Sequence, residues 1–246
     1  MLVSHNNMKA PEVLSALALL ANPEKAKILQ RFFKTGKGQY GEGDQFLGII
    51  VPETRKVAQK FRDLPLPEIE KLLQSQIHEA RLCAVFILIK QYDRDPENIF
   101  KLYCSNFKNI NNWDLVDSSA SYIIGRHLYG KKIDLLIKLA RSKNFWERRI
   151  AIIATLYFIV KGNPEPTLQI AEMLLNDGHD LIHKAVGWML REVGKRCSRE
   201  AEENFLRRYA ARMPRTMLRY AIERFPEEKR KWYLSQGNLV LQRNKI

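Results

Sequence analysis

The sequence has few cysteines, no long apolar run and little β-strand signal, and each shortage excludes a class of protein. The three cysteines, Cys83, Cys104 and Cys197, are too few and too widely spaced for a disulfide framework, and they predict a reducing compartment, the cytoplasm. The longest apolar run, residues 150–160, is too short to cross a bilayer, so we expect no membrane partner. The first nine residues contain no apolar segment ahead of a cleavage site, and we expect no secretory signal.

Positive charge is what the sequence has in excess. The 41 Lys and Arg residues outnumber the 27 Asp and Glu residues, which gives a net charge of +14. Residues 1–122 carry a net charge of +2, and residues 123–246 carry +12. This asymmetry predicts a cationic surface on the second half, as expected of a protein that binds the phosphate backbone of nucleic acid. Other basic proteins, including ribosome-associated ones, share such a composition.

Helical periodicity recurs along the chain in blocks of roughly 12 to 18 residues. Several blocks begin with proline at the first helical position, as at Pro23, Pro52, Pro67 and Pro96. The predicted helices cover residues 23–34, 52–64, 67–76, 78–92, 96–107, 111–128, 132–142, 144–162, 166–176, 179–196, 199–212 and 213–225.

The later helices repeat at a nearly constant spacing. Aligning Arg81, Asp117, Arg149, Lys184 and Met217 gives offsets of 36, 32, 35 and 33 residues. A period near 34 residues, with two helices per unit, is typical of an α-solenoid of the HEAT type. We therefore expect an all-α fold, a single domain over residues 1–246 that forms a curved superhelix with a basic concave groove.

Residues 34–45 interrupt this helical pattern. They contain four of the twelve glycines and cannot form a continuous helix. The segment is predicted to be either a mobile loop or a short hairpin between helices. Lys34 and Lys37 could contact a phosphate there, although solvated lysines in a loop are the commoner case.

Common catalytic and metal-binding signatures are missing. The sequence has no phosphate-binding loop, no dinucleotide-binding glycine motif, and no CxxC or HExxH spacing. His179 and His183 lie four residues apart and could chelate a metal, but no Cys or carboxylate completes the set, so we favour a structural role for them. We expect neither a metal nor an organic cofactor. Cys83 and Cys197 are expected to be buried in helices, as small apolar residues.

Tryptophans recur at matching positions of successive repeats. Trp113, Trp146 and Trp188 each fall in the second helix of a pair, and tryptophans in solenoids are most often core residues. Trp113 and Asp117 are four residues apart and share a helix face. Asp114 lies in the first turn, after the N-cap expected at Asn112, where the helix dipole stabilises a carboxylate.

A carboxylate beside aromatic rings suggests chemistry on a cation. Asp117 would repel phosphate, so it suits plain DNA binding poorly. Cleavage of an N-glycosidic bond builds positive charge on the sugar, which a carboxylate stabilises. An alkylated base is already cationic and leaves as a neutral molecule without a general acid, and aromatic faces attract the same charge.

Cations flank the later tryptophans. Lys184, Trp188 and Arg191 form a stripe on one helix face, and we expect all of these cations to contribute to the groove. Arg148 and Arg149 are adjacent and cannot both point inward. We expect Arg149 inside and Arg148 solvated outside.

Five motifs together resemble the AlkD-type DNA alkylation repair family. They are NPEKA (22–26), FLGIIVPETRK (46–56), WDLVD (113–117), WERR (146–149) and KAVGWMLRE (184–192). The resemblance implies a HEAT-like DNA glycosylase that excises cationic alkylpurines such as 3-methyladenine and 7-alkylguanine in base excision repair, without flipping the lesion into a pocket. Carried over by position, Asp117 is the catalytic carboxylate, Trp113 and Trp188 flank the lesioned nucleotide, and Arg149 contacts the backbone.

The sequence departs from the family at two positions and in one segment. Phe32 and Ile50 stand where glycosylase members carry Tyr and Gln, and residues 34–45 are longer than in compact members. Asp114, Phe32 and Trp146 are expected to support the site. The implied partner is double-stranded DNA, bound by a monomer. Two alternatives stay open: a non-catalytic binder of branched or structured DNA, and a HEAT scaffold for an acidic protein.

Overall fold

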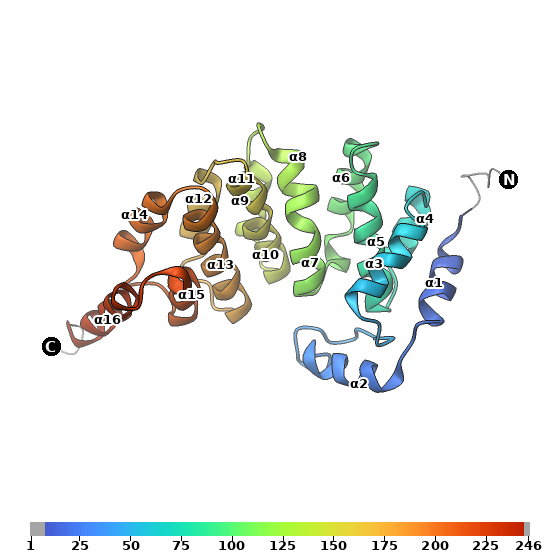
Figure 1. Ribbon diagram of the computed structural model, residues 1–246, viewed down its shortest axis with the longest axis horizontal. Coiled ribbons are helices and arrows are strands. Elements are labelled where there is room, and N and C mark those ends of the chain that lie inside the picture. Colours follow the sequence, from blue (N-terminus) through green and yellow to red (C-terminus); the bar gives the residue numbers. More distant parts are fainter. Residues whose placement is uncertain (1–7, 244–246) are drawn as a thin grey trace. The chain divides into compact units, whose positions relative to one another are not determined.

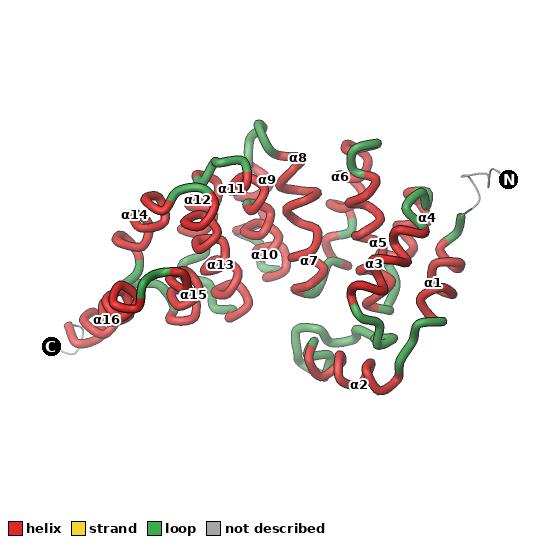
Figure 2. The backbone as a smooth tube through the Cα atoms, viewed as in Figure 1, coloured by secondary structure: helices red, strands yellow, loops and turns green. Residues whose placement is uncertain are grey.

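A computed structural model describes residues 8–243 of the chain, with side chains up to residue 235. Within this range every regular element is a helix, apart from an isolated parallel bridge between Gln45 and Ile77. Figure 2 shows the helices joined by loops and turns. The predicted all-α, helical-repeat fold is confirmed. None of the helices in the described range is both long and apolar enough to span a membrane.

The helices form two compact units, Met1–Ser119 and Ala120–Ile246. Each unit has its own buried core. That the two units make up one domain with a concave basic groove stays a prediction.

The first unit is built around α5 (His78–Gln91), whose residues from His78 to Leu88 are all buried. It packs against α1, α3, α4 and α6, whereas no residue of α2 is buried. Figure 1 shows α2 lying crosswise to α1, α3 and α5. The other elements are α1 (Ala10–Ala18), α2 (Pro23–Phe32), α3 (Val51–Lys60), α4 (Leu66–Leu73), α6 (Pro96–Ser105), η2 (Phe107–Asn109) and α7 (Trp113–Ala120), which ends at the unit boundary.

The second unit is built around α13 (Asp180–Arg196), which packs against α10, α12, α14 and α15. Gly187 allows the close approach of α15, because a Cβ there would collide with the carbonyl oxygen of Met217. The other elements are η3 (Ser121–Gly125), α8 (Arg126–Leu128), α9 (Asp134–Ala140), α10 (Phe145–Ala154), α11 (Leu156–Val160), α12 (Glu165–Met173), α14 (Arg199–Tyr209), α15 (Arg215–Ala221), η4 (Ile222–Arg224) and α16 (Glu227–Arg243).

The starts of α2 and α6 agree with the sequence signals, whereas α3 and α4 begin one residue before Pro52 and Pro67. Pro23 takes the first position of α2, and the Asn22 side chain before it accepts the N–H of Lys25 at 3.0 Å. Asp95 caps α6, which begins with Pro96, in the same way.

Three features of the helices were not predicted. Helices α1 and α16 lie outside the predicted set. The predicted helix over 111–128 contains a π-helical turn, η3. The predicted helix over 144–162 is divided at Thr155, whose hydroxyl donates to the carbonyl of Ile152 at 2.7 Å.

The glycine-rich segment, residues 34–45, is a succession of turns. The N–H of Gly41 donates to the carbonyl of Lys34 at 3.0 Å, and the N–H of Asp44 donates to that of Gly41 at 3.1 Å. Gly38 and Gly43 have positive φ angles of 75° and 88°, which the turns require. The hairpin alternative is therefore wrong.

All three cysteines are free thiols. Cys83 is buried in α5, as predicted, and burial raises the pKa of its thiol to about 12. Cys197 is the C-cap of α13 and is only half-buried, contrary to the prediction.

Candidate functional site

Trp113, the first residue of α7, belongs to an aromatic stack. Its ring lies parallel to that of Phe33, with centroids 5.1 Å apart and planes inclined by 8°. Phe33 stacks on Phe46 at 4.9 Å, and Phe46 stacks on His78 at 4.4 Å. Phe32, 59% exposed, meets the Trp113 ring edge-on at 5.9 Å. The stack thus runs from a solvent-facing aromatic to a buried histidine.

The imidazole of His78 lies between two carboxylates. Its Nδ1 is 3.1 Å from Oδ2 of Asp44, and its Nε2 is 2.8 Å from Oδ2 of Asp114; all three residues are buried. An ionised carboxylate only accepts hydrogen bonds, so both ring nitrogens donate and the ring is an imidazolium. Burial opposes this charge, but the Asp114 carboxylate and the hydrogen bond to Asp44 raise the pKa of His78 to about 9.

Two further side chains complete this group. Arg81 donates to Oδ1 of Asp44 at 2.6 Å and to the carbonyl of Ser75 at 2.7 Å. The Asn112 amide donates to Asp44 at 3.3 Å, and its oxygen accepts the N–H of Trp113 at 2.8 Å. We call Asp44, His78, Arg81, Asn112 and Asp114 the His78 network. Burial works against the Asp44 charge, but His78 and Arg81 hold the pKa of Asp44 below its usual value.

The structure changes the role expected of Asp114. It lies in the first turn of α7, as predicted, and Asn112 directly precedes that helix. However, its side chain is an ion-pair partner of His78, and its Oδ1 accepts the N–H of Leu115 at 2.8 Å. With 8% exposure and both oxygens engaged, Asp114 is a buried structural carboxylate rather than a simple helix-end charge.

Asp117 lies one turn further along α7, on the face of the helix that carries Trp113. Both residues are half-buried, so their side chains retain contact with solvent. The first unit therefore brings together Trp113, Asp117, Asp114 and Phe32, all residues predicted for the site.

The segment that leads to Ile50 is held by a buried carboxylate. Glu79 accepts the N–H groups of Leu47, Gly48 and Ile49 at 2.9 to 3.1 Å. Gly48 has a φ of 84°, and a Cβ there would collide with the carbonyl oxygen of Asn22, so this segment abuts the start of α2. Ile50 itself is 48% exposed.

Lys34 and Lys37 are both exposed in the glycine-rich segment, as their predicted role requires. A cavity of about 690 Å³ is lined by residues of α2 and by Thr35, Gly36 and Gln39 of the glycine-rich segment. Lys27 and Arg31 line it from α2, and Lys27 pairs with Glu24 at 3.0 Å.

In the second unit, the predicted cations of α13 are paired. Nζ of Lys184 is 2.7 Å from Asp180, and Arg191 forms ion pairs with Glu223 and Glu192. Trp188, between them in sequence, is half-buried. Phosphate binding by Lys184 or Arg191 would thus compete with a carboxylate already in place, and it stays a prediction.

Arg148 and Arg149 have different surroundings, and whether Arg149 faces a groove stays a prediction. Arg149 is 5% exposed and donates to the carbonyl of Leu181. Arg148 is not solvated: its Nε lies 2.5 Å from Oδ2 of Asp177, and it donates to the carbonyl of Ser142 at 2.9 Å. The expectation of a solvated Arg148 is wrong, because the loop after α12 supplies a carboxylate that sequence periodicity does not reveal.

The contacts of Trp146 and of the two histidines, His179 and His183, indicate structural roles. Trp146 is 5% exposed and its ring centroid is 4.2 Å from that of Phe145. His179 stacks on Phe145 at 4.0 Å and caps α13, and the ring of His183 donates to the carbonyl of Asp177 at 2.5 Å. Among the described residues, no group of three His, Cys, Asp or Glu side chains is arranged to hold a metal ion.

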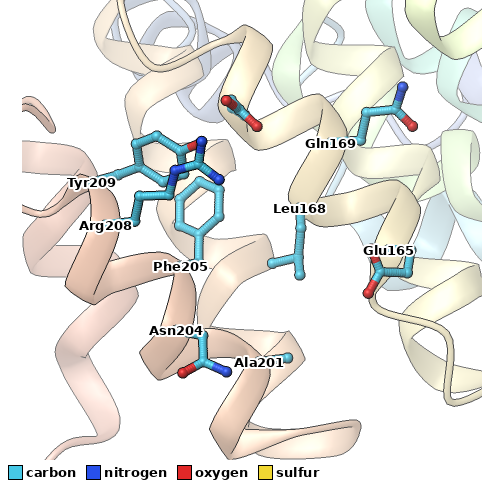
Figure 3. A pocket seen from close by; sticks show the side chains of 9 residues that line it. Glu165, Leu168, Gln169, Ala201, Asn204, Phe205, Arg208 and Tyr209 are labelled. Carbon is cyan, nitrogen blue, oxygen red and sulfur yellow. The ribbon is translucent and has the colours of Figure 1, made fainter.

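A separate cavity of about 620 Å³ lies between α12 and α14 of the second unit. Figure 3 shows Leu168 of α12 opposite Phe205 and Tyr209 of α14, with Glu165 and Arg208 among the polar residues around them. No residue predicted for the site lines this cavity.

Sequence reasoning missed three members of the His78 network: Asp44, His78 and Arg81. Asp44 and His78 are 34 residues apart in the chain, and Asp44 and Asn112 are 68 apart. The available signal was local: a His, a Glu and an Arg in the first turn of a helix that continues with the apolar run of residues 82–89.

The chain resembles proteins that repair alkylated DNA. Residues 13–225 match the family described as DNA alkylation repair enzyme. The fold matches a solved structure titled "Predicted DNA alkylation repair enzyme from Enterococcus faecalis", with a TM-score of 0.69, 20% identity, and coverage of 84% of this chain and 97% of that chain. No curated protein matches the sequence.

Proposed function

The chain belongs to the DNA alkylation repair enzyme family, which assigns it a role in the repair of alkylated DNA, and we propose that it acts as a DNA glycosylase on cationic alkylpurines. The observation that carries this proposal is that the two carboxylates of α7 have different surroundings. Asp114 is withdrawn into the His78 network, whereas Asp117 stays half-exposed beside Trp113.

Asp117 is the group suited to the chemistry. As the C–N bond lengthens, positive charge develops on the sugar, and a carboxylate stabilises it and orients the attacking water. An N-alkylated purine leaves as a neutral base, so the site needs no general acid. The bond between C1′ and the base nitrogen breaks and its electron pair leaves with the neutral base, while a water oxygen bonds to C1′ and gives up one proton to solvent.

Trp113 is the group suited to the substrate's charge. Its indole, fixed on Phe33 and flanked by the exposed Phe32 ring, offers an aromatic surface to a cationic base. We assign Trp188 and Arg149 of the second unit to the lesioned nucleotide and its backbone by position in the family motifs. Arg149 is the least accessible of the proposed contacts, because it is 5% exposed.

A second candidate function, recognition of DNA structure without base release, is favoured by one observation. The glycine-rich segment is an ordered succession of turns that presents Lys34 and Lys37 to solvent. Such an element suits phosphates in a particular arrangement.

Release of free base from duplex DNA that carries 7-methylguanine or 3-methyladenine separates the two functions. The glycosylase proposal expects base release well above the spontaneous rate, by a monomer that binds duplex DNA. Tight binding to branched DNA with base release no faster than the spontaneous rate would instead support structure recognition.

A further inference from the structure

We infer that His78 is a positioning residue of the proposed reaction: its ring, hydrogen-bonded to Asp44 and Asp114, fixes the first turn of α7 relative to the glycine-rich segment. This inference rests on the proposed glycosylase function, because the first turn of α7 carries Trp113, which is assigned to the lesion, and leads to Asp117 one turn later.

His78 acts on α7 through two routes. The direct route is the hydrogen bond from Nε2 to Asp114, the second residue of α7. The second route passes from Nδ1 to Asp44, and from Asp44 through the Asn112 amide to the N–H of Trp113. The backbone N–H of Trp113 and the side chain of Asp114 are thus both connected to the His78 ring through hydrogen bonds.

The same ring also fixes the glycine-rich segment. Asp44 is the last residue but one of that segment, and Arg81 donates to its other oxygen, Oδ1, at 2.6 Å. The N–H of His78 donates to the carbonyl of Gln45 at 2.8 Å, and Phe46 covers the imidazole. The glycine-rich segment, which carries the exposed lysines, and α7, which carries the proposed catalytic carboxylate, are therefore both held by the buried His78 side chain.

The arrangement depends on the protonated ring. Three charged groups face His78: Asp44 from the glycine-rich segment, Asp114 from α7, and Arg81 from α5 itself. A neutral imidazole has one N–H, so deprotonation leaves one of the two carboxylates without its donor. Misplacement of Asp117 by a fraction of an ångström would then slow a reaction that depends on alignment.

Substitution of His78 by glutamine tests the inference. His78→Gln keeps a hydrogen-bond donor but cannot carry charge or serve both carboxylates with the ring geometry. We expect single-turnover base release at saturating enzyme to slow at least about tenfold, with DNA affinity within about threefold of the parent. The parent should also lose rate as pH rises through about 9, and this limb should be absent from His78→Gln.

Asn106→Ala is the matched control. Its buried side-chain amide, at the end of α6, donates to the carbonyl of Leu102 at 3.0 Å and to Glu70 at 3.2 Å, so the variant loses buried hydrogen bonds of the first unit without touching the network. Compared at equal fraction folded, it should keep the parent rate. If His78→Gln fails to fold, Asp114→Asn, which retains an oxygen acceptor for His78, takes its place with the same expected loss.

A spectroscopic readout is independent of activity. In ¹⁵N-histidine-labelled parent at pH 8, His78 should show protons on both ring nitrogens, and both signals should vanish in His78→Gln. Two results would overturn the inference: a single ring proton at pH 8, or parent-like rates and pH dependence in His78→Gln. A parent that releases no base would overturn the proposed function and the positioning role together, whereas an active parent with an equally active His78→Gln overturns the inference alone.

Discussion

Arg81 of the first unit and Arg148 of the second occupy matching places, each as the fourth residue of its helix. Each pairs with an aspartate from a loop and donates to the carbonyl six residues earlier, Ser75 and Ser142 respectively. The surroundings differ. In the second unit Asp177 otherwise contacts local groups, such as the N–H of His179 at 2.8 Å. In the first unit Asp44 also binds His78, which connects it to α7.

The arginine–aspartate pair of the second unit therefore has a structural role alone, whereas the pair of the first unit is also connected to the candidate site. The same arginine–aspartate geometry closes a loop in both units. Only where a histidine adds a second carboxylate, Asp114, does the pair hold a helix with half-exposed Trp and Asp side chains. In this chain the repeated arginine–aspartate pair is a feature of the fold, and the addition of His78 and Asp114 to one copy marks the candidate site.

The two units also differ in net charge, and here the second unit has the larger value. The second unit carries nearly all of the net positive charge, yet the cations predicted to bind DNA there are paired with carboxylates or buried. Exposed cations lie elsewhere in it, at Lys132, Lys138, Arg141, Lys143, Lys195, Arg212 and Arg219. Total charge thus predicts the class of partner but not the contacts.

The largest expected difference between the units is in the stability lost when the aspartate of each arginine–aspartate pair is removed. Asp44→Ala removes the buried carboxylate that both His78 and Arg81 bind, which leaves His78 with Asp114 alone and Arg81 with the carbonyl of Ser75, and it should lower the free energy of unfolding by about 4 kcal/mol. Asp177→Ala should cost about 2 kcal/mol, because carbonyl groups still hold Arg148. Urea denaturation of both variants provides the measurement. Equal losses would show that the first-unit network adds nothing to the shared pair.

The pH dependence of stability should follow His78. Its pKa is raised above the ordinary value of 6.5, so the folded chain holds this proton more tightly than the unfolded chain. That stabilisation is fully present below about pH 6.5 and is lost as pH rises to about 9, and it amounts to the order of 3 kcal/mol. The quantity to measure is the difference in unfolding free energy between the parent and His78→Gln across this range. The difference cancels the titration of Glu202 in α14, because burial raises the pKa of that carboxyl to about 8 in both proteins. A constant difference would mean that His78 is not charged between its carboxylates.

The smallest expected effect concerns the phosphates of bound DNA. Substituting Lys34 and Lys37 together by alanine should lower the slope of log affinity against log salt by up to about 2, because each lysine would neutralise one phosphate. The matched pair, Lys184 and Arg191, should change the slope less, because carboxylates already hold them. A larger change from the second pair would show that DNA displaces Asp180 and Glu223.

Local features of the fold were predictable from the sequence, and long-range ones were not. Proline and asparagine signals set the start of α2 through Asn22 and Pro23, because capping depends on neighbouring residues. The turns of residues 34–45 follow from Gly38 and Gly43, but their attachment to α5 depends on the hydrogen bond between Asp44 and Arg81. No periodicity encodes that contact.

The site was predictable only in part, for a related reason. The spacing of Trp113 and Asp117 places both on one helix face, which needs no tertiary information. The different role of Asp114 depends on His78, which is 36 residues away. Likewise, the pairing of Arg148 depends on Asp177, 29 residues away, so sequence reasoning left it solvated.

The central claim, that Asp117 performs the chemistry while Asp114 holds the helix, is tested most directly by single-turnover base release from methylated duplex DNA. Asp117→Asn should slow release by about 100- to 1,000-fold while binding DNA as well as the parent or better, since it removes a negative charge. Asp114→Asn should slow release less and should lower the free energy of unfolding more. The reverse pattern, a stable and inactive Asp114→Asn beside an active Asp117→Asn, would contradict this claim.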